Sequence, residues 1–136
     1  MKSRETLIRL KRFQVDEKRR QVADIETMIV DFERMVAELE QQIVAEQERT
    51  GISDVAHFAY PTFAKAAMQR RDNLRASINE LKAQLEAAQE ELEEAFEELK
   101  KVELIEEREA ERERAVTGAR QQAELDEIGT TMHRRR

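Results

Sequence analysis

The sequence contains no cysteine and no tryptophan, and it has only one proline and three glycines. Without cysteine, the chain forms no disulfide bond and offers no thiolate as a nucleophile or metal ligand. The glycines stand alone, which excludes the glycine-rich loops that bind nucleotide phosphates. Because no such loop and no thiolate is present, we expect no bound cofactor. The scarcity of glycine and proline also means that few residues interrupt a helix.

Long apolar runs are also missing. The longest ones span a few residues, which is too short to cross a membrane. The charged beginning MKSRETLIRLKR has no apolar core of signal-peptide length. We therefore expect a cytoplasmic protein.

Aromatic residues make up only 4% of the chain, whereas charged residues make up 40%. This composition is typical of long helices and coiled coils rather than of a deep globular core. The net charge of −6 is unevenly spread. Residues 1–20 carry eight Lys or Arg against three Asp or Glu, and residues 80–107 carry eleven Glu against three Lys. We expect oppositely charged segments to lie beside each other.

β-Branched residues recur every seven positions in the first part of the chain. A repeat of seven kept over six heptads requires about 3.5 residues per turn and is typical of a left-handed coiled coil. We predict a helix over residues 4–49, with these residues at heptad position a. They are Ile8, Val15, Val22, Ile29, Val36 and Ile43.

A second apolar seam follows, with spacings that alternate between three and four residues. It predicts a helix over residues 61–127, followed by a flexible tail at residues 128–136, because Gly118 and Gly129 weaken the helix. The seam ends at Val102, so residues after about 104 have no partner helix. Its members are Ile78, Leu81, Leu85, Ala88, Leu92, Ala95, Leu99 and Val102.

Residues 50–60 separate the two helices. Gly51 suits a left-handed cap after the first helix, and Pro61 suits the start of the second. When Ile8 is placed opposite Val102, every a residue of the first helix faces an apolar residue of the second. The two numbers of each pair add to 110, which places the apex at Val55. The predicted fold is all-α, one domain over residues 1–136: a long antiparallel two-helix coiled-coil hairpin whose second helix overhangs at the C-terminal end.

Nothing in this pattern provides a catalytic site. An active carboxylate needs a water-poor environment to shift its pKa, and two paired helices provide none. The nearest metal motif is one Asp54-x-x-His57 in the bend, where metal sites in helical bundles need such motifs from two helices. We expect no enzyme activity and no metal, and we expect His57 to cap or pack the turn. We also expect no nucleic-acid binding, because acidic residues of the second helix lie beside the basic N-terminal segment.

Several apolar residues lie off the seam, and they suggest partner sites. One group is at the open end of the hairpin: Leu7, Leu10, Phe13, Leu104 and Ile105. These residues are either tolerated surface apolars or a partner-binding site, and their concentration favours the site. At the bend, Phe58, Tyr60 and Phe63 either pack the turn or bind a second partner.

The segments ETLIRLKRFQVDEKRRQVADIE and ELEQQIVAEQERTGI, the bend with Tyr60-x-x-Phe63, and the charged C-terminal overhang resemble the FliJ family of the flagellar type III protein export apparatus. The resemblance covers nearly the whole chain and implies an antiparallel coiled coil similar to the central stalk of rotary ATPases. It implies a non-catalytic, monomeric protein at the base of the flagellum, on the inner face of the cell membrane.

The resemblance also implies partners. The open end would insert into the ring of the export ATPase and activate it, and other surfaces would contact the cytosolic domain of the export gate and the export chaperones. Tyr60 and Phe63 match the family's gate-associated tyrosine and phenylalanine. Where the family usually has a larger aliphatic residue, four positions after Phe63, this chain has Ala67.

Two other functions remain open from the residues. One is a structural scaffold or cargo-chaperone adaptor without effect on an ATPase, which would form homo-oligomers through its outer faces. The other is a coiled coil that places an acidic tip in a polymerase channel. That mechanism needs a pair of acids, and the bend has only Asp54.

Overall fold

The computed structural model describes residues 2–134, which form two helices, α1 (Lys2–Thr50) and α2 (Thr62–Arg134). The chain divides into two compact units. Unit 1 contains residues 1–14 and 95–136, and unit 2 contains residues 15–94. In the described part of each unit, a segment of α1 packs against a segment of α2, which confirms the predicted all-α pairing of two long helices.

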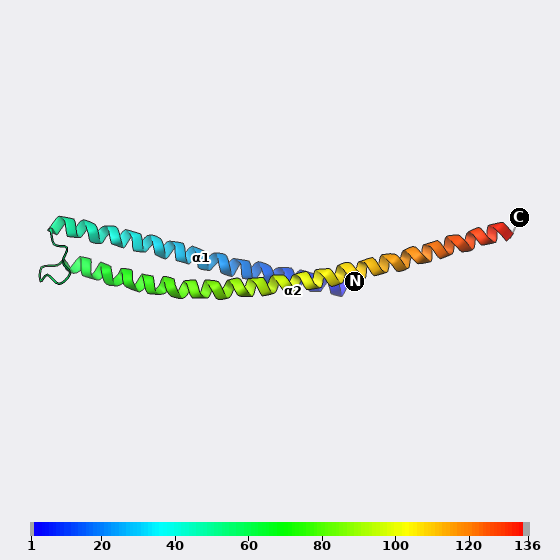
Figure 1. Cartoon of the computed structure of the whole chain (residues 1–136), viewed down its shortest axis with the longest axis horizontal. Helices are drawn as coiled ribbons and strands as arrows, with labels where there is room; N and C mark the ends of the chain where they lie inside the picture. Colours follow the sequence, from blue (N-terminus) through cyan, green and yellow to red (C-terminus); the bar gives the residue numbers. More distant parts are fainter. Residues whose placement is uncertain (1, 135–136) are drawn as a thin grey trace. The chain divides into compact units, whose positions relative to one another are not determined.

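In unit 2, α1 and α2 lie side by side, run in opposite directions and are joined by residues 51–61 (Figure 1). The seam between them is formed by the predicted heptad residues. One buried cluster contains Ile29, Val36, Ile78 and Leu81, and a second contains Leu39, Ile43 and Ala67. These partners are those that the predicted register places opposite each other.

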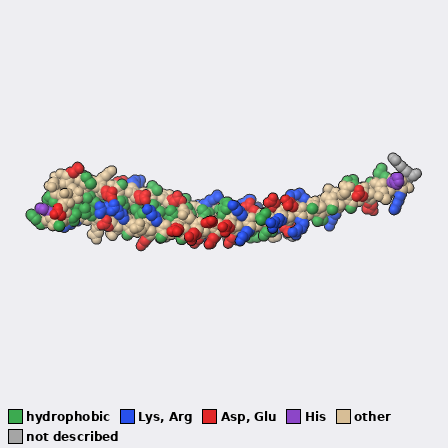
Figure 2. Space-filling view, in the orientation of Figure 1, with side chains coloured by type: hydrophobic (Ala, Val, Ile, Leu, Met, Phe, Trp, Pro, Cys, Tyr) green, Lys and Arg blue, Asp and Glu red, His purple; other side chains and the backbone are tan. Residues whose placement is uncertain are grey.

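Ion pairs follow the same register in unit 2. Lys18 Nζ lies 2.9 Å from Glu91 Oε2, and Lys82 Nζ lies 4.0 Å from Glu33 Oε1. Arg75 pairs with Glu40. Acidic and basic side chains accordingly appear next to each other along the helices (Figure 2). Surface pairs of this kind contribute little energy each, so their main effect is to favour one register over its alternatives.

In unit 1, the α1 segment packs against only the first part of the α2 segment. Every residue from Glu111 to Arg134 is exposed, but Arg4 of α1 still pairs with Glu106, Glu109 and Glu113. The overhang of α2 therefore begins after these residues and not at the predicted residue 104. The helix extends past the predicted end at residue 127 and includes the part of the predicted flexible tail up to Arg134. Gly118 and Gly129 cost a helix only about 1 kcal/mol each, and helix-forming Ala, Gln, Glu and Arg surround Gly118. Residues 135–136 of the predicted tail lie outside the described residues.

The packing of the seam predicts that substitutions of two neighbouring residues, Ile29 and Val30, change the free energy of unfolding by very different amounts. We expect Ile29→Ala to lower the free energy of unfolding by about 2–5 kcal/mol, because it opens a cavity in the core. Ile29 is 8% exposed, whereas the adjacent Val30 is 62% exposed. Val30→Ala is therefore the matched control and should change stability by less than about 0.5 kcal/mol. Thermal and urea unfolding followed by circular dichroism measures both, and equal losses would contradict the assigned seam.

Candidate partner-binding surfaces

An ionic cluster holds the two helices together in unit 1. Arg4 Nε lies 2.9 Å from Glu106 Oε2, and the two guanidinium NH groups lie 3.5 Å from Glu109 and 2.7 Å from Glu113. These residues occupy a and d positions, so the apolar seam is replaced by a charged one. Arg4 Nε and Glu106 Oε2 are both shielded from water. They form an ion pair with each other, but neither atom makes a well-aligned hydrogen bond.

The cluster shifts the pKa values of its members. The hydrogen bond from Arg4 to Glu113 lowers the pKa of that carboxyl below its ordinary 4.5, and the positive charge of Arg4 adds to the effect. The same hydrogen bond raises the pKa of Arg4. Further along, Lys11 Nζ lies 3.0 Å from Glu98, and Arg12 lies 3.9 Å from Glu103. The basic N-terminal segment therefore lies against the glutamates of α2, as predicted.

The predicted open-end residues all belong to unit 1 and are all exposed, by 41% to 56%. We call them the collar: Leu7, Leu10, Phe13, Leu104 and Ile105. None of them occupies an a or d position, so none is needed for the seam. Large apolar side chains that remain open to water without a packing role are typical of partner-binding surfaces.

Heptad positions show how the collar residues are distributed. Leu7 and Ile105 both occupy g, and in an antiparallel pair the two g positions lie on the same flank. Leu10, at c, extends this flank. Phe13 and Leu104 occupy f, on the outer side of each helix, and therefore face in opposite directions. The collar thus covers the g flank and the outer side of each helix instead of forming one flat patch.

The bend begins as predicted. Gly51 has φ = +73°, the left-handed conformation that favours glycine, and its N–H donates to the carbonyl of Gln47 at 2.8 Å. The Asp54 carboxylate then accepts from the Ala56 N–H at 3.0 Å. The His57 Nδ1 accepts from the Ala59 N–H, also at 3.0 Å. The expectation that His57 caps or packs the turn is confirmed, and Asp54 serves the same purpose.

The three bend aromatics do not form one surface. Tyr60 is only 5% exposed, and its hydroxyl accepts from Gln47 Nε2 at 2.8 Å and lies 3.9 Å from Met68 Sδ. Phe58 is 97% exposed and stacks on the His57 ring with 4.7 Å between centroids, while Phe63 is 56% exposed. Tyr60 therefore joins the helices near the bend, and Phe58 and Phe63 are open to a partner. Hydrophobic side chains gather around the bend in the space-filling view (Figure 2).

A sequence signal for the burial of Tyr60 exists. The seam of α2, extended backwards in steps of seven from Ala67, reaches Tyr60 at position d, and Ala64 falls at a. Both are buried. The predicted seam began too late to include them.

Within residues 2–134, no group of three or more acidic or histidine side chains is arranged to hold a metal ion. No helix of this part of the chain is long and apolar enough to cross a membrane. The buried side chains of the same residues are all apolar except for the Tyr60 hydroxyl.

Two long antiparallel helices paired along an apolar seam define a coiled-coil protein. The model of one protein family, the flagellar FliJ protein, matches residues 1–136, the whole chain. The chain therefore belongs to the FliJ family and is a component of the flagellar protein export system. No curated protein and no solved structure matches it significantly.

The buried hydroxyl of Tyr60 leads to one prediction. Tyr60→Phe removes the acceptor of the Gln47 side chain and should lower the free energy of unfolding by about 0.5–1.5 kcal/mol. Phe58→Ala is the control, because Phe58 packs against little except His57. Denaturation curves of the two variants check this, and an unchanged stability of Tyr60→Phe would show that the hydrogen bond is not formed in solution.

The Arg4 cluster leads to a prediction on pH. Because the folded-state pKa of Glu113 is depressed, its stabilisation is present above pH 4.5 and is lost as the pH falls through the folded-state value. Arg4→Met should raise the pKa of Glu113 towards 4.5, whereas Arg114→Met should leave it unchanged. Carboxyl ¹³C NMR titration measures the shift, with the Glu113 signal assigned by its loss in Glu113→Gln. A Glu113 pKa that Arg4→Met does not move would disprove the contact.

Proposed function

We propose that this chain is a non-catalytic stalk that inserts into the ring of the flagellar export ATPase and stimulates it. The observation that carries the proposal is the collar, whose exposed apolar side chains cover one flank and both outer sides of the helix pair of unit 1. A flat partner would cover one flank and leave Phe13 or Leu104 in water. A ring that encloses the helices covers all five side chains.

The seam beside the collar supports insertion into an enclosing partner. Lys11 occupies a d position but extends outwards to Glu98, and Ile8 and Val102 are only half-buried. Few apolar contacts therefore hold the helices together here. The pair can adjust its spacing when the ring closes on it, at a small cost in packing energy.

The bend provides the surface for a second partner, the cytosolic domain of the export gate. Phe58 and Phe63 are the exposed aromatics there, and exposed aromatics are common anchors of protein interfaces. Tyr60 is buried, so its part in gate binding is to hold the start of α2 in place. Export chaperones are further partners that the family suggests.

This function places the protein in the cytoplasm at the base of the flagellum, peripheral to the membrane and held there by its partners. It requires no enzyme activity, cofactor or nucleic acid of its own. A stalk is a monomer, whereas a scaffold or chaperone adaptor would form homo-oligomers. Light scattering of the purified chain distinguishes the two.

The experiment that tests the proposal is turnover of the purified export ATPase with and without the chain. Wild type should stimulate the ATPase, and the double variant Leu10→Asp, Phe13→Asp should lose most of the stimulation, because it places two carboxylates where apolar contacts are needed. The matched control is Met28→Asp, Met35→Asp, which changes two exposed residues of the same helix by the same charge. It should stimulate like wild type.

None of the changed residues lies in the seam, so we expect all variants to stay helical. Circular dichroism checks this. Equal stimulation by wild type and by Leu10→Asp, Phe13→Asp would contradict the proposed stalk function and favour the scaffold or adaptor function.

A further inference from the structure

The outer face of α1 in unit 2 carries small apolar residues that the seam does not use. They occupy heptad position b, directly after the seam residues at a, and recur every seven residues. All four are exposed, and Val30 and Val44 leave 62% and 52% of their surface open to water. We call this row the α1 outer stripe: Ala23, Val30, Ala37 and Val44.

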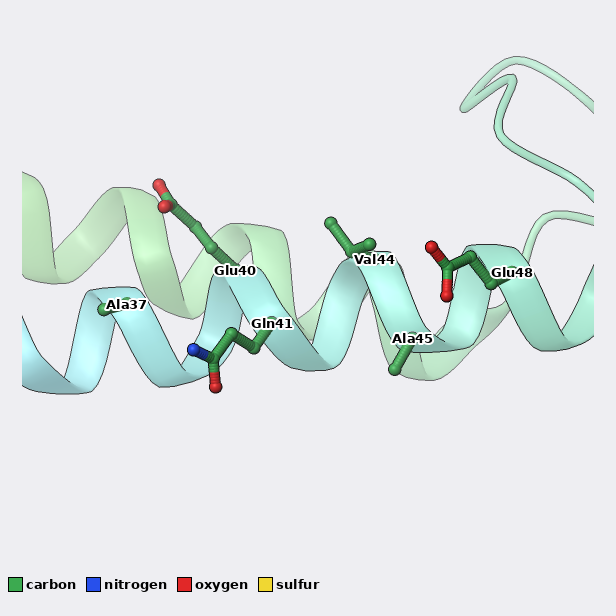
Figure 3. Close-up of a pocket in the computed structure, with 6 residues that line it drawn as sticks. All are labelled: Ala37, Glu40, Gln41, Val44, Ala45 and Glu48. Carbon is green, nitrogen blue, oxygen red and sulfur yellow. The ribbon is translucent and has the colours of Figure 1, made fainter.

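The stripe includes a shallow hollow of about 440 Å³. Figure 3 shows that the six side chains lining it all come from α1: Ala37, Glu40, Gln41, Val44, Ala45 and Glu48. Ala37 and Ala45 end at a methyl group and leave space between the longer side chains around them. A hollow between residues four and seven apart on one helix is the shape that receives a side chain of a facing helix.

Carboxylates at heptad positions e and f flank the stripe. Glu33 and Glu40 have cationic partners from this chain. In the part of the chain that the structure describes, no cationic partner is found for two further acids of this face. They are Glu26, at e, and Glu48, at f. A partner with basic side chains would therefore gain both apolar burial and charge pairing at this surface.

We propose that the α1 outer stripe binds a basic amphipathic helix of another protein. Its apolar row places a large aliphatic side chain in the hollow beside Ala37, and its Lys or Arg residues pair with the flanking carboxylates. A second copy of this chain is a poorer occupant, because its own basic segment already pairs Arg4, Lys11 and Lys18 with glutamates of α2. The stripe shares no residue with the collar or the bend aromatics, so it is an additional partner site.

The test uses a labelled synthetic peptide of about four heptads with leucine at a and d and lysine at e and g. Binding to the full chain is measured by fluorescence anisotropy. The peptide should bind wild type, and the double variant Val30→Lys, Val44→Lys should bind it at least about tenfold more weakly. The matched control Met28→Lys, Met35→Lys adds the same two charges to another flank of α1 and should lose much less affinity. Affinity should also fall as salt screens the charges.

Four results would overturn the proposal. Equal loss in both double variants would mean general attraction to an acidic surface. A peptide with glutamate in place of lysine that binds as tightly, or a lysine peptide that does not bind, would exclude a basic helix. Self-association of the wild-type chain in sedimentation, abolished by Val30→Lys, Val44→Lys, would show that a second copy occupies the stripe. Circular dichroism verifies that the variants stay helical.

Discussion

The packing of β-branched a residues of α1 against α2 is the constraint on which the other features depend. Residues such as Ile29 and Val36 contact Ile78 and Leu81 in one register, and a slip by one heptad would move every ion pair as well. The partners Glu40 with Arg75 and Glu33 with Lys82 occupy e positions on both helices, where only this register brings them together. Apolar packing therefore supplies the energy, and the charges select the alignment.

Much of the fold was predictable because the residues that contact each other in a coiled coil recur in the sequence at a fixed period. The positions of α1, the turn at Gly51 and the pairing of the basic segment with α2 glutamates all follow from spacing and charge. The end of α2 was not predictable from its glycines, because a single glycine costs about 1 kcal/mol in a helix and does not terminate it. The division into two units also has no sequence signal that the heptads reveal.

The candidate sites were predictable only in part. Exposed apolar residues at f and g identify the collar because large side chains off the seam are conspicuous. Tyr60 is different, because an aromatic residue at a bend suggests a partner-binding surface. Only when the heptad pattern is extended back to Tyr60 does it predict that this side chain is buried in the seam, as the structure shows. The α1 outer stripe has the weakest signal. Ala and Val at surface positions are common in helices, and only their period of seven and the flanking carboxylates distinguish them.

The heptad thus assigns different tasks to different positions. Positions a and d hold the helices together, and e and g align them. Positions b, c and f remain available for partners, together with g at the collar. Unit 1 departs from this division, because Arg4 occupies a d position and three glutamates replace the apolar residues opposite it. Ionic contacts of this kind specify an alignment more than they stabilise it, since the charges lose hydration when they pair. Next to the collar, the helices are therefore aligned by charge but only weakly held by apolar packing, which suits the proposed insertion into another protein.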